Sequence, residues 1–100
     1  EIVTAYYLRL RVADQAGVLA RVTGILADAG ISIDAMLQRE ADEISAVVGQ
    51  GGAEPQVAQT DLIILTHDTR EGTMNDALAR MQVLPSVLQP ITRIRKEELA

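Results

Sequence analysis

The sequence contains no cysteine, phenylalanine or tryptophan, and its two tyrosines are its only aromatic residues. The lack of cysteine excludes disulfides, thiolate nucleophiles and zinc clusters, and it fits a reducing compartment such as the cytoplasm. Because aromatic residues are scarce, the core must be built from Leu, Ile, Val, Ala and Met, which suits helices packed on a sheet. The net charge of −5 and the shortage of stacking side chains argue against a nucleic-acid partner.

Length and hydropathy limit the domain organisation. The 100 residues suffice for one domain with one core. No apolar run is long enough to span a bilayer and no signal peptide is recognisable, so we expect no membrane partner. The chain begins at Glu1 with an apolar-polar pattern almost from the start. We therefore expect a piece of a longer protein, with residues 1–5 as the remnant of an interdomain linker and residues 6–100 as the domain.

The first half of the chain shows clear hydrophobic periodicity. Residues 6–12 alternate between apolar and polar side chains, which predicts a half-buried strand. Apolar residues then recur at helical spacing over 18–29, and Gly30 is well placed to end that helix in the left-handed conformation. Residues 31–38 alternate again and predict a second strand. The stretch 40–59 stays unassigned, as a longer hairpin or a short helix.

The second half repeats this pattern. Residues 61–67 form a continuous apolar run, typical of a central strand covered on both faces. Asp68 and Glu71 resemble a capping box ahead of a second amphipathic helix that ends before Pro85. Residues 86–96 return as a last strand. Because Pro90 cannot donate a hydrogen bond to a ladder, we expect this strand at a sheet edge.

The order of these elements predicts an α+β fold of the ferredoxin-like βαββαβ type. This fold is a two-layer sandwich of a four-stranded antiparallel sheet with two helices on one face, and its first and third strands are central. Since the helices cover only one face, the apolar third strand needs cover from a second copy of the domain or from a neighbouring domain. The fold alone does not decide function, which depends on the residues of the site.

The turn between the first strand and the first helix is the candidate ligand site. Unpaired N–H groups and a partial positive charge at a helix start suit a carboxylate, and Asp14 beside them suits an ammonium. Together these groups match a free amino acid. In the alternative reading, Asp14 caps the helix and Gly17 only permits a tight turn. The residues alone leave both readings open.

No residue pattern indicates catalysis or a metal. His67 is the only histidine and precedes Asp68, but it has no nucleophile or second ligand within its local sequence, so we interpret it as an ordinary strand-end residue. Acylphosphatase chemistry would need an arginine to hold phosphate and an amide side chain to orient water. Arg21 and Asn75 are of these types, but each lies in a predicted helix rather than beside an anion-binding loop. The cluster at 49–52 lacks the lysine of a phosphate loop and is interpreted as a flexible turn.

The chain resembles the ACT domain, a small regulatory module that binds amino acids. The resemblance rests on Asp14, Gly17, Val18 and Leu19, followed by the run at 25–33, and it covers almost the whole chain. More narrowly, the segments 6–10, 33–38, 61–67 and 84–87 look like the C-terminal ACT domain of bacterial homoserine dehydrogenases. The sequence departs from the usual pattern at Ala16, where proline is common, and at Asp14 and Ser32, where asparagine is common. The turn is thus less preorganised than is usual for the family.

This resemblance implies an amino-acid effector, by implication L-threonine, and a homodimer formed through the sheet. The effector would bind between the glycine turn of one copy and the second strand of another, and the implied site residues are Asp14, Gly17, Val18, Leu19, Ser32 and Ile33. The parent enzyme would reduce aspartate semialdehyde to homoserine with NAD(P), and its catalytic domains would be partners of this chain. No cofactor and no catalytic site are expected within the chain. The alternatives are a ligand-free oligomerisation module and the ACT domain of another enzyme, such as aspartate kinase.

Overall fold

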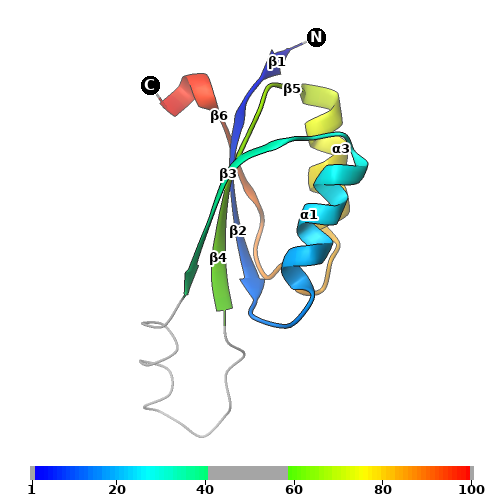
Figure 1. Cartoon of the computed structure of the whole chain (residues 1–100), viewed down its shortest axis with the longest axis vertical. Coiled ribbons are helices and arrows are strands. Elements are labelled where there is room, and N and C mark those ends of the chain that lie inside the picture. Colours follow the sequence, from blue (N-terminus) through cyan, green and yellow to red (C-terminus); the bar gives the residue numbers. More distant parts are fainter. Residues whose placement is uncertain (1, 41–58, 100) are drawn as a thin grey trace, which may run out of the picture.

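A four-stranded antiparallel sheet with two helices on one face forms the centre of the computed structural model, which describes residues 2–40 and 59–99 (Figure 1). The strands lie in the order β3-β4-β2-β6. Their bounds, and those of the helices, are Tyr6–Ala13 (β2), Val18–Asp28 (α1), Ile33–Glu40 (β3), Gln59–Thr66 (β4), Glu71–Gln82 (α3) and Thr92–Arg95 (β6). The ferredoxin-like α+β prediction is confirmed, with the first and third of its four strands in the centre.

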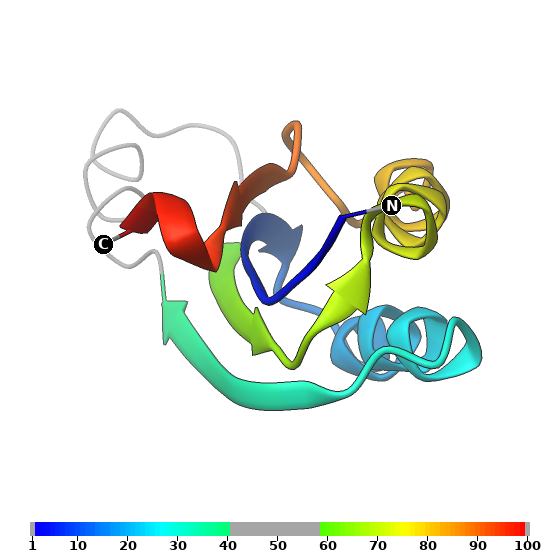
Figure 2. The same ribbon diagram turned by 90° about the horizontal axis from the view of Figure 1, so that it is seen from above.

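The core lies between the sheet and the two helices. Figure 2 shows α1 and α3 on the same side of the sheet. On that side every second residue of the central strands is buried, as in the series Tyr6, Leu8 and Leu10 of β2. The helices contribute the apolar stripes that their spacing predicted. The buried members of those stripes are Val18, Val22, Leu26, Met74, Ala77 and Met81.

The opposite side of the sheet, here called the open face, is not covered by an α-helix within the described residues (Figure 2). Leu62 and Ile64 of β4 are buried against the helices, whereas Ile63 is half-buried and Leu65 is exposed on the open face. Among residues 2–40 and 59–99, the apolar run of β4 therefore has cover on one face only. Cover of the second face by another copy or another domain stays a prediction.

Both ends of α1 depend on a glycine. Gly17 precedes the helix with φ +85°, and Gly30 follows it with φ +77°, conformations that side chains with a Cβ rarely adopt. The Gly30 N–H donates to the Ala27 carbonyl, and the Ile31 N–H donates to the Leu26 carbonyl. These two bonds make a Schellman motif. The predicted role of Gly30 as a left-handed helix terminator is confirmed.

The predicted capping box is wrong. α3 starts at Glu71 with Arg70 as its N-cap, and the Arg70 side chain makes no capping hydrogen bond. The reason is a short ladder that the sequence pattern did not reveal. Thr69–Arg70 (β5) pairs with Val3–Thr4 (β1), which holds the residues before α3 in an extended conformation. Residues of the expected linker remnant thus form β1 and lie against the start of α3.

The last strand is shorter than predicted. Only Thr92–Arg95 pairs continuously with β2, and Val87 makes an isolated bridge to Val12. Pro90 lies between these two contacts, where the chain leaves the ladder. Lys96–Leu99 then forms a 3-10 helix, η1. The predicted edge position of this strand is confirmed. Most of the unassigned stretch 40–59 lies outside the described residues.

Candidate functional site

The glycine turn lies at the end of β2, below the start of α1 (Figure 1). The Gln15 N–H donates to the Ala13 carbonyl at 2.9 Å, and Gly17 turns the chain into the helix. Gly17, rather than Asp14, is the N-cap residue, and no side chain caps the helix. The reading of Asp14 as a helix cap is therefore wrong, while the tight turn at Gly17 is confirmed.

The first turn of α1 offers free hydrogen-bond donors. The Arg21 N–H is the first to donate to a backbone carbonyl at helical spacing, that of Gly17. Within the described residues, the N–H groups of Leu19 and Ala20 have no acceptor. Such donors at a helix start attract an anion. Asp14 is exposed beside them and has no ion pair in the described part of the chain.

A small hollow lies beneath this turn. Its volume is about 30 Å³. Besides the turn and the first residues of α1, it is lined by residues from three strands, namely Val12 and Ala13 of β2, Gln38 of β3, and Thr60 and Leu62 of β4. This space exceeds the roughly 10–15 Å³ that one water molecule needs. One copy of the chain therefore has room here for a small terminal group of a ligand.

Gln38 and Thr60 were not expected at this site from the sequence. Thr60 is only 1% exposed, and its hydroxyl has no hydrogen-bond partner among residues 2–40 and 59–99. Thr60 is in phase with Leu62 and Ile64, which face the helices. Extending that alternation by one step would have revealed a buried polar residue below the turn. Gln38 could be placed only with the strand register, which pairs it with Leu62.

Ser32 and Ile33 lie at the other end of the sheet. Ile33 pairs with Thr66, the last residue of β4, whereas Ala13 next to the turn pairs with Gln59, the first residue of that strand. The Ser32 carbonyl accepts a hydrogen bond from the His67 N–H at 2.9 Å. One chain therefore does not bring Ser32 and Ile33 to Asp14, Gly17, Val18 and Leu19. Only a second copy can supply them to the turn.

β3 forms one margin of the sheet (Figure 2) and pairs only with β4 in the part of the chain that the structure describes. Its register slips by one residue at Asp34, between the pairs of Ile33 and Ala35. Met36 and Leu37 are 42% and 55% exposed on this strand. A strand of eight residues with an open edge and exposed apolar side chains is a template for pairing with another chain.

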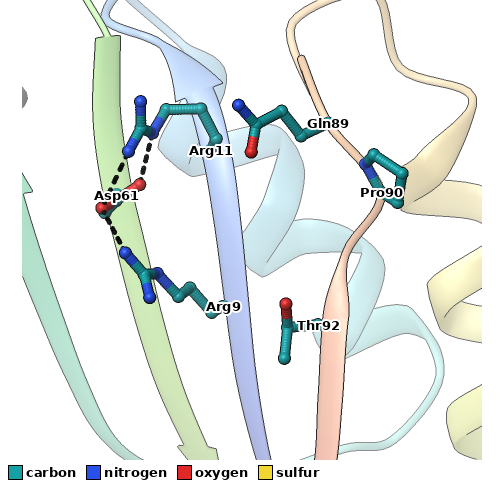
Figure 3. A pocket seen from close by; sticks show the side chains of 6 residues that line it. All are labelled: Arg9, Arg11, Asp61, Gln89, Pro90 and Thr92. Carbon is teal, nitrogen blue, oxygen red and sulfur yellow. Dashed lines mark hydrogen bonds and ion pairs between the residues drawn. The ribbon is translucent and has the colours of Figure 1, made fainter. Parts of the chain in front are cut away.

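A second hollow, of about 260 Å³, lies on the open face (Figure 3). Arg9 and Arg11 of β2 reach Asp61 of β4, while Gln89, Pro90 and Thr92 line the far side. Arg11 donates from Nε to Asp61 Oδ1 at 2.5 Å and from Nη2 to Oδ2 at 3.2 Å, and Arg9 donates to Oδ2 at 3.2 Å. The hydrogen bonds from Arg11 hold the pKa of Asp61 below its usual range. These ion pairs tie the two central strands together.

The remaining titratable groups form no reactive arrangement in the described ranges. His67 Nε2 lies 3.6 Å from Asp34 Oδ1, and both side chains are exposed. The described residues include no group of three or more side chains able to hold a metal ion. None of the helices in this part of the chain is both long and apolar enough to cross a bilayer.

Residues 6–85 match the ACT domain family. The chain belongs to this family. The resemblance inferred from the glycine turn and the four segments is thus confirmed.

Relatives of this ACT domain include longer enzymes. It is 50% identical over 100 residues to a homoserine dehydrogenase of Methylobacillus glycogenes and 41% identical over 96 residues to one of Pseudomonas aeruginosa. The two matches include 100% and 96% of this chain. They include only about a fifth of each relative, namely 21% and 19% of its length.

Two solved structures resemble the domain. The homoserine dehydrogenase of Thiobacillus denitrificans matches 94% of this chain with 17% of its own, at 42% identity and a TM-score of 0.70. The ligand-free regulatory subunit of aspartate kinase from Thermus thermophilus matches 91% of this chain with 50% of its own. Its TM-score is 0.58, and its identity of 19% shows a shared fold alone.

The Asp61 cluster gives this ACT domain a pH-dependent stability. Because its folded pKa is lowered, the Asp61 carboxylate contributes fully above the unfolded value of about 3.9 and loses its effect as the pH falls through the folded value. We expect Asp61→Asn to lower the free energy of unfolding by about 1–3 kcal/mol near neutral pH, because it leaves Arg11 without its charged partner. Urea unfolding at about pH 7 and about pH 3 measures this difference. A difference that stays constant across this range would contradict the assignment.

Proposed function

We propose that this chain is the regulatory ACT domain of a homoserine dehydrogenase and that it binds L-threonine. Through it, threonine would inhibit the NAD(P)-dependent reduction of aspartate semialdehyde to homoserine, as an end product of the pathway. The observation that carries the proposal is the hollow beneath the glycine turn, which is lined by the start of α1 and by Thr60, whose buried hydroxyl has no partner among the described residues. The homoserine dehydrogenases that match the whole chain support the choice of parent enzyme.

The groups around the turn complement the common part of an amino acid. The N–H groups of Leu19 and Ala20 and the positive end of α1 suit the carboxylate. The carboxylate of Asp14 suits the ammonium. Neither group is occupied by a partner within the described chain, so binding needs no internal contact to break.

A second copy completes the proposed site. If β3 pairs antiparallel with β3 of another copy about a point between Ala35 and Met36, Ile33 of one copy lies opposite Gln38 of the other. Gln38 lines the hollow under the turn, so Ser32 and Ile33 of the second copy would close its open side. The pairing also covers the free edge of β3. Each dimer would thus hold two equivalent effector sites.

Binding across this dimer provides a route to regulation. An effector held by two copies binds the paired arrangement better than the separated one, so it shifts the equilibrium toward the paired state. The catalytic domains of the parent enzyme would sense that shift. We assign NAD(P) and the substrate to those domains, and no residue of this chain to either.

Isothermal titration of the chain with L-threonine tests the proposal, with L-serine, L-lysine and L-isoleucine as controls. The protein concentration must be one at which light scattering shows a dimer. Saturable binding that is tightest for threonine is the expected result. A dimer that takes up none of the four amino acids would point instead to a ligand-free assembly module, for which the free edge of β3 is sufficient.

A further inference from the structure

We propose that Thr60 recognises the side-chain hydroxyl of the effector, and that this contact makes the site selective for short β-hydroxy amino acids. The inference rests on the proposed function and adds the group that decides which amino acid binds. Under this proposal, valine, which has the shape of threonine without the hydroxyl, is the ligand that the site must reject.

The first step is the position of Thr60. It is the second residue of β4 and lies in the ladder opposite Val12 on one side and Glu40 on the other. Its side chain is on the helix side of the sheet and borders the hollow. A buried hydroxyl without a partner destabilises a fold, because it has lost its hydrogen bonds to water. A ligand atom would restore the missing bond.

Comparison with other threonines makes Thr60 exceptional. Thr66, on the same strand and also buried, accepts a hydrogen bond from the Tyr6 N–H at 3.1 Å. Thr69 donates to the His67 carbonyl at 2.9 Å. The hydroxyls of Tyr6 and Ser86 also lack partners within residues 2–40 and 59–99, but neither residue lines the hollow below the glycine turn.

The second step is the size and lining of the hollow. It has room for one small group, while the rest of the ligand stays at the turn and against the second copy. A ligand held by its carboxylate at the helix start and by its ammonium at Asp14 directs only a short side chain beneath the turn. There Val18, Leu19 and Leu62 offer apolar contact to a methyl, and Thr60 and Gln38 offer polar contact to a hydroxyl.

The test compares L-threonine with L-valine by isothermal titration of three proteins. The unaltered chain is expected to prefer threonine, and Thr60→Val is expected to bind threonine about tenfold more weakly while binding valine at least as well. Thermal unfolding of ligand-free Thr60→Val is expected at the same temperature as the unaltered chain or higher, because the substitution removes an unpaired hydroxyl. Thr60→Ser keeps the hydroxyl and should keep the preference for threonine.

Thr66→Val is the matched control. It makes the same change on the same strand and face, but it removes an acceptor that the Tyr6 N–H uses. This variant should unfold at a lower temperature and keep the ratio of threonine to valine affinity. The opposite pattern in the two variants separates a ligand contact from a structural one.

Each further outcome has one meaning. If the unaltered chain binds neither amino acid as a dimer, the proposed function fails and this inference fails with it. If the unaltered chain prefers threonine and Thr60→Val keeps that ratio, the inference is overturned and the proposed function stands. A loss of stability in ligand-free Thr60→Val as large as in Thr66→Val would also overturn it, since the hydroxyl would then have a partner within the fold.

Discussion

Replacing Gly17 with alanine is expected to lower the free energy of unfolding by about 1–2 kcal/mol and to weaken effector binding. Gly17 has φ +85°, and a Cβ added there would meet no atom within 4 Å. The cost therefore comes from the left-handed backbone and not from a clash. To relieve it, the turn must shift, and the shift moves Asp14 relative to the donors of α1. Denaturant unfolding and titration with threonine measure the two effects.

Gly24→Ala provides the matched control for this change. Gly24 lies within α1, is exposed, and also has no atom within 4 Å of an added Cβ. Its backbone φ is not positive, so alanine there should raise the free energy of unfolding by up to about 1 kcal/mol through helix propensity. The same change from glycine to alanine, made at two positions seven residues apart, thus has opposite expected signs. Equal effects would show that the backbone of Gly17 is not what the turn depends on.

Introducing lysine at both Met36 and Leu37 is expected to convert the dimer to a monomer and to abolish threonine binding. Both side chains are exposed on β3, whose outer edge has no partner within the described residues, and charged residues at such an edge prevent pairing with another strand. The fold should survive, because neither residue belongs to the buried core. Light scattering gives the oligomeric state, and titration with threonine gives the binding.

Val83→Lys is the control for added charge. Val83 is 79% exposed after α3, far in the fold from β3, so the dimer and the binding should persist in this variant. If the Met36 and Leu37 double variant stays dimeric, pairing through β3 is wrong. The open face, with Leu65, would then be the interface, and Ser32 and Ile33 would have no route to the turn of another copy.

The parts of the fold that were predicted from the sequence are those set by local signals. The end of α1 at Gly30 was predicted correctly because periodicity and a left-handed glycine agree at one position. The edge position of the last strand was predicted from Pro90, because proline has no backbone N–H to donate to a neighbouring strand. The central position of β4 followed from its apolar run. Each of these signals acts within a few residues along the chain.

The errors come from contacts between distant residues. Asp68 and Glu71 have the spacing of a capping box, but pairing between β1 and β5 decides the conformation of that segment, and β1 lies more than sixty residues away. Thr60 and Gln38 meet below the glycine turn only because of the register of β4 with its two neighbours. Sequence spacing cannot give that register. Because the register is not known from the sequence, the prediction that Ser32 lies near the turn depended on the assumption of a second copy.

Glu71 links the two ends of the described chain. Its N–H donates to the Ile2 carbonyl, and its carboxylate accepts a hydrogen bond from Arg95 at 2.7 Å, next to η1. The first residue of α3 thus connects the segment before β2 and the end of β6 to one helix (Figure 1). A displacement applied at Ile2 reaches α3 through one backbone hydrogen bond, and it reaches the four-stranded sheet through Arg95 of β6. The start of α3 therefore couples the helix layer to β6, at the edge of the sheet opposite β3.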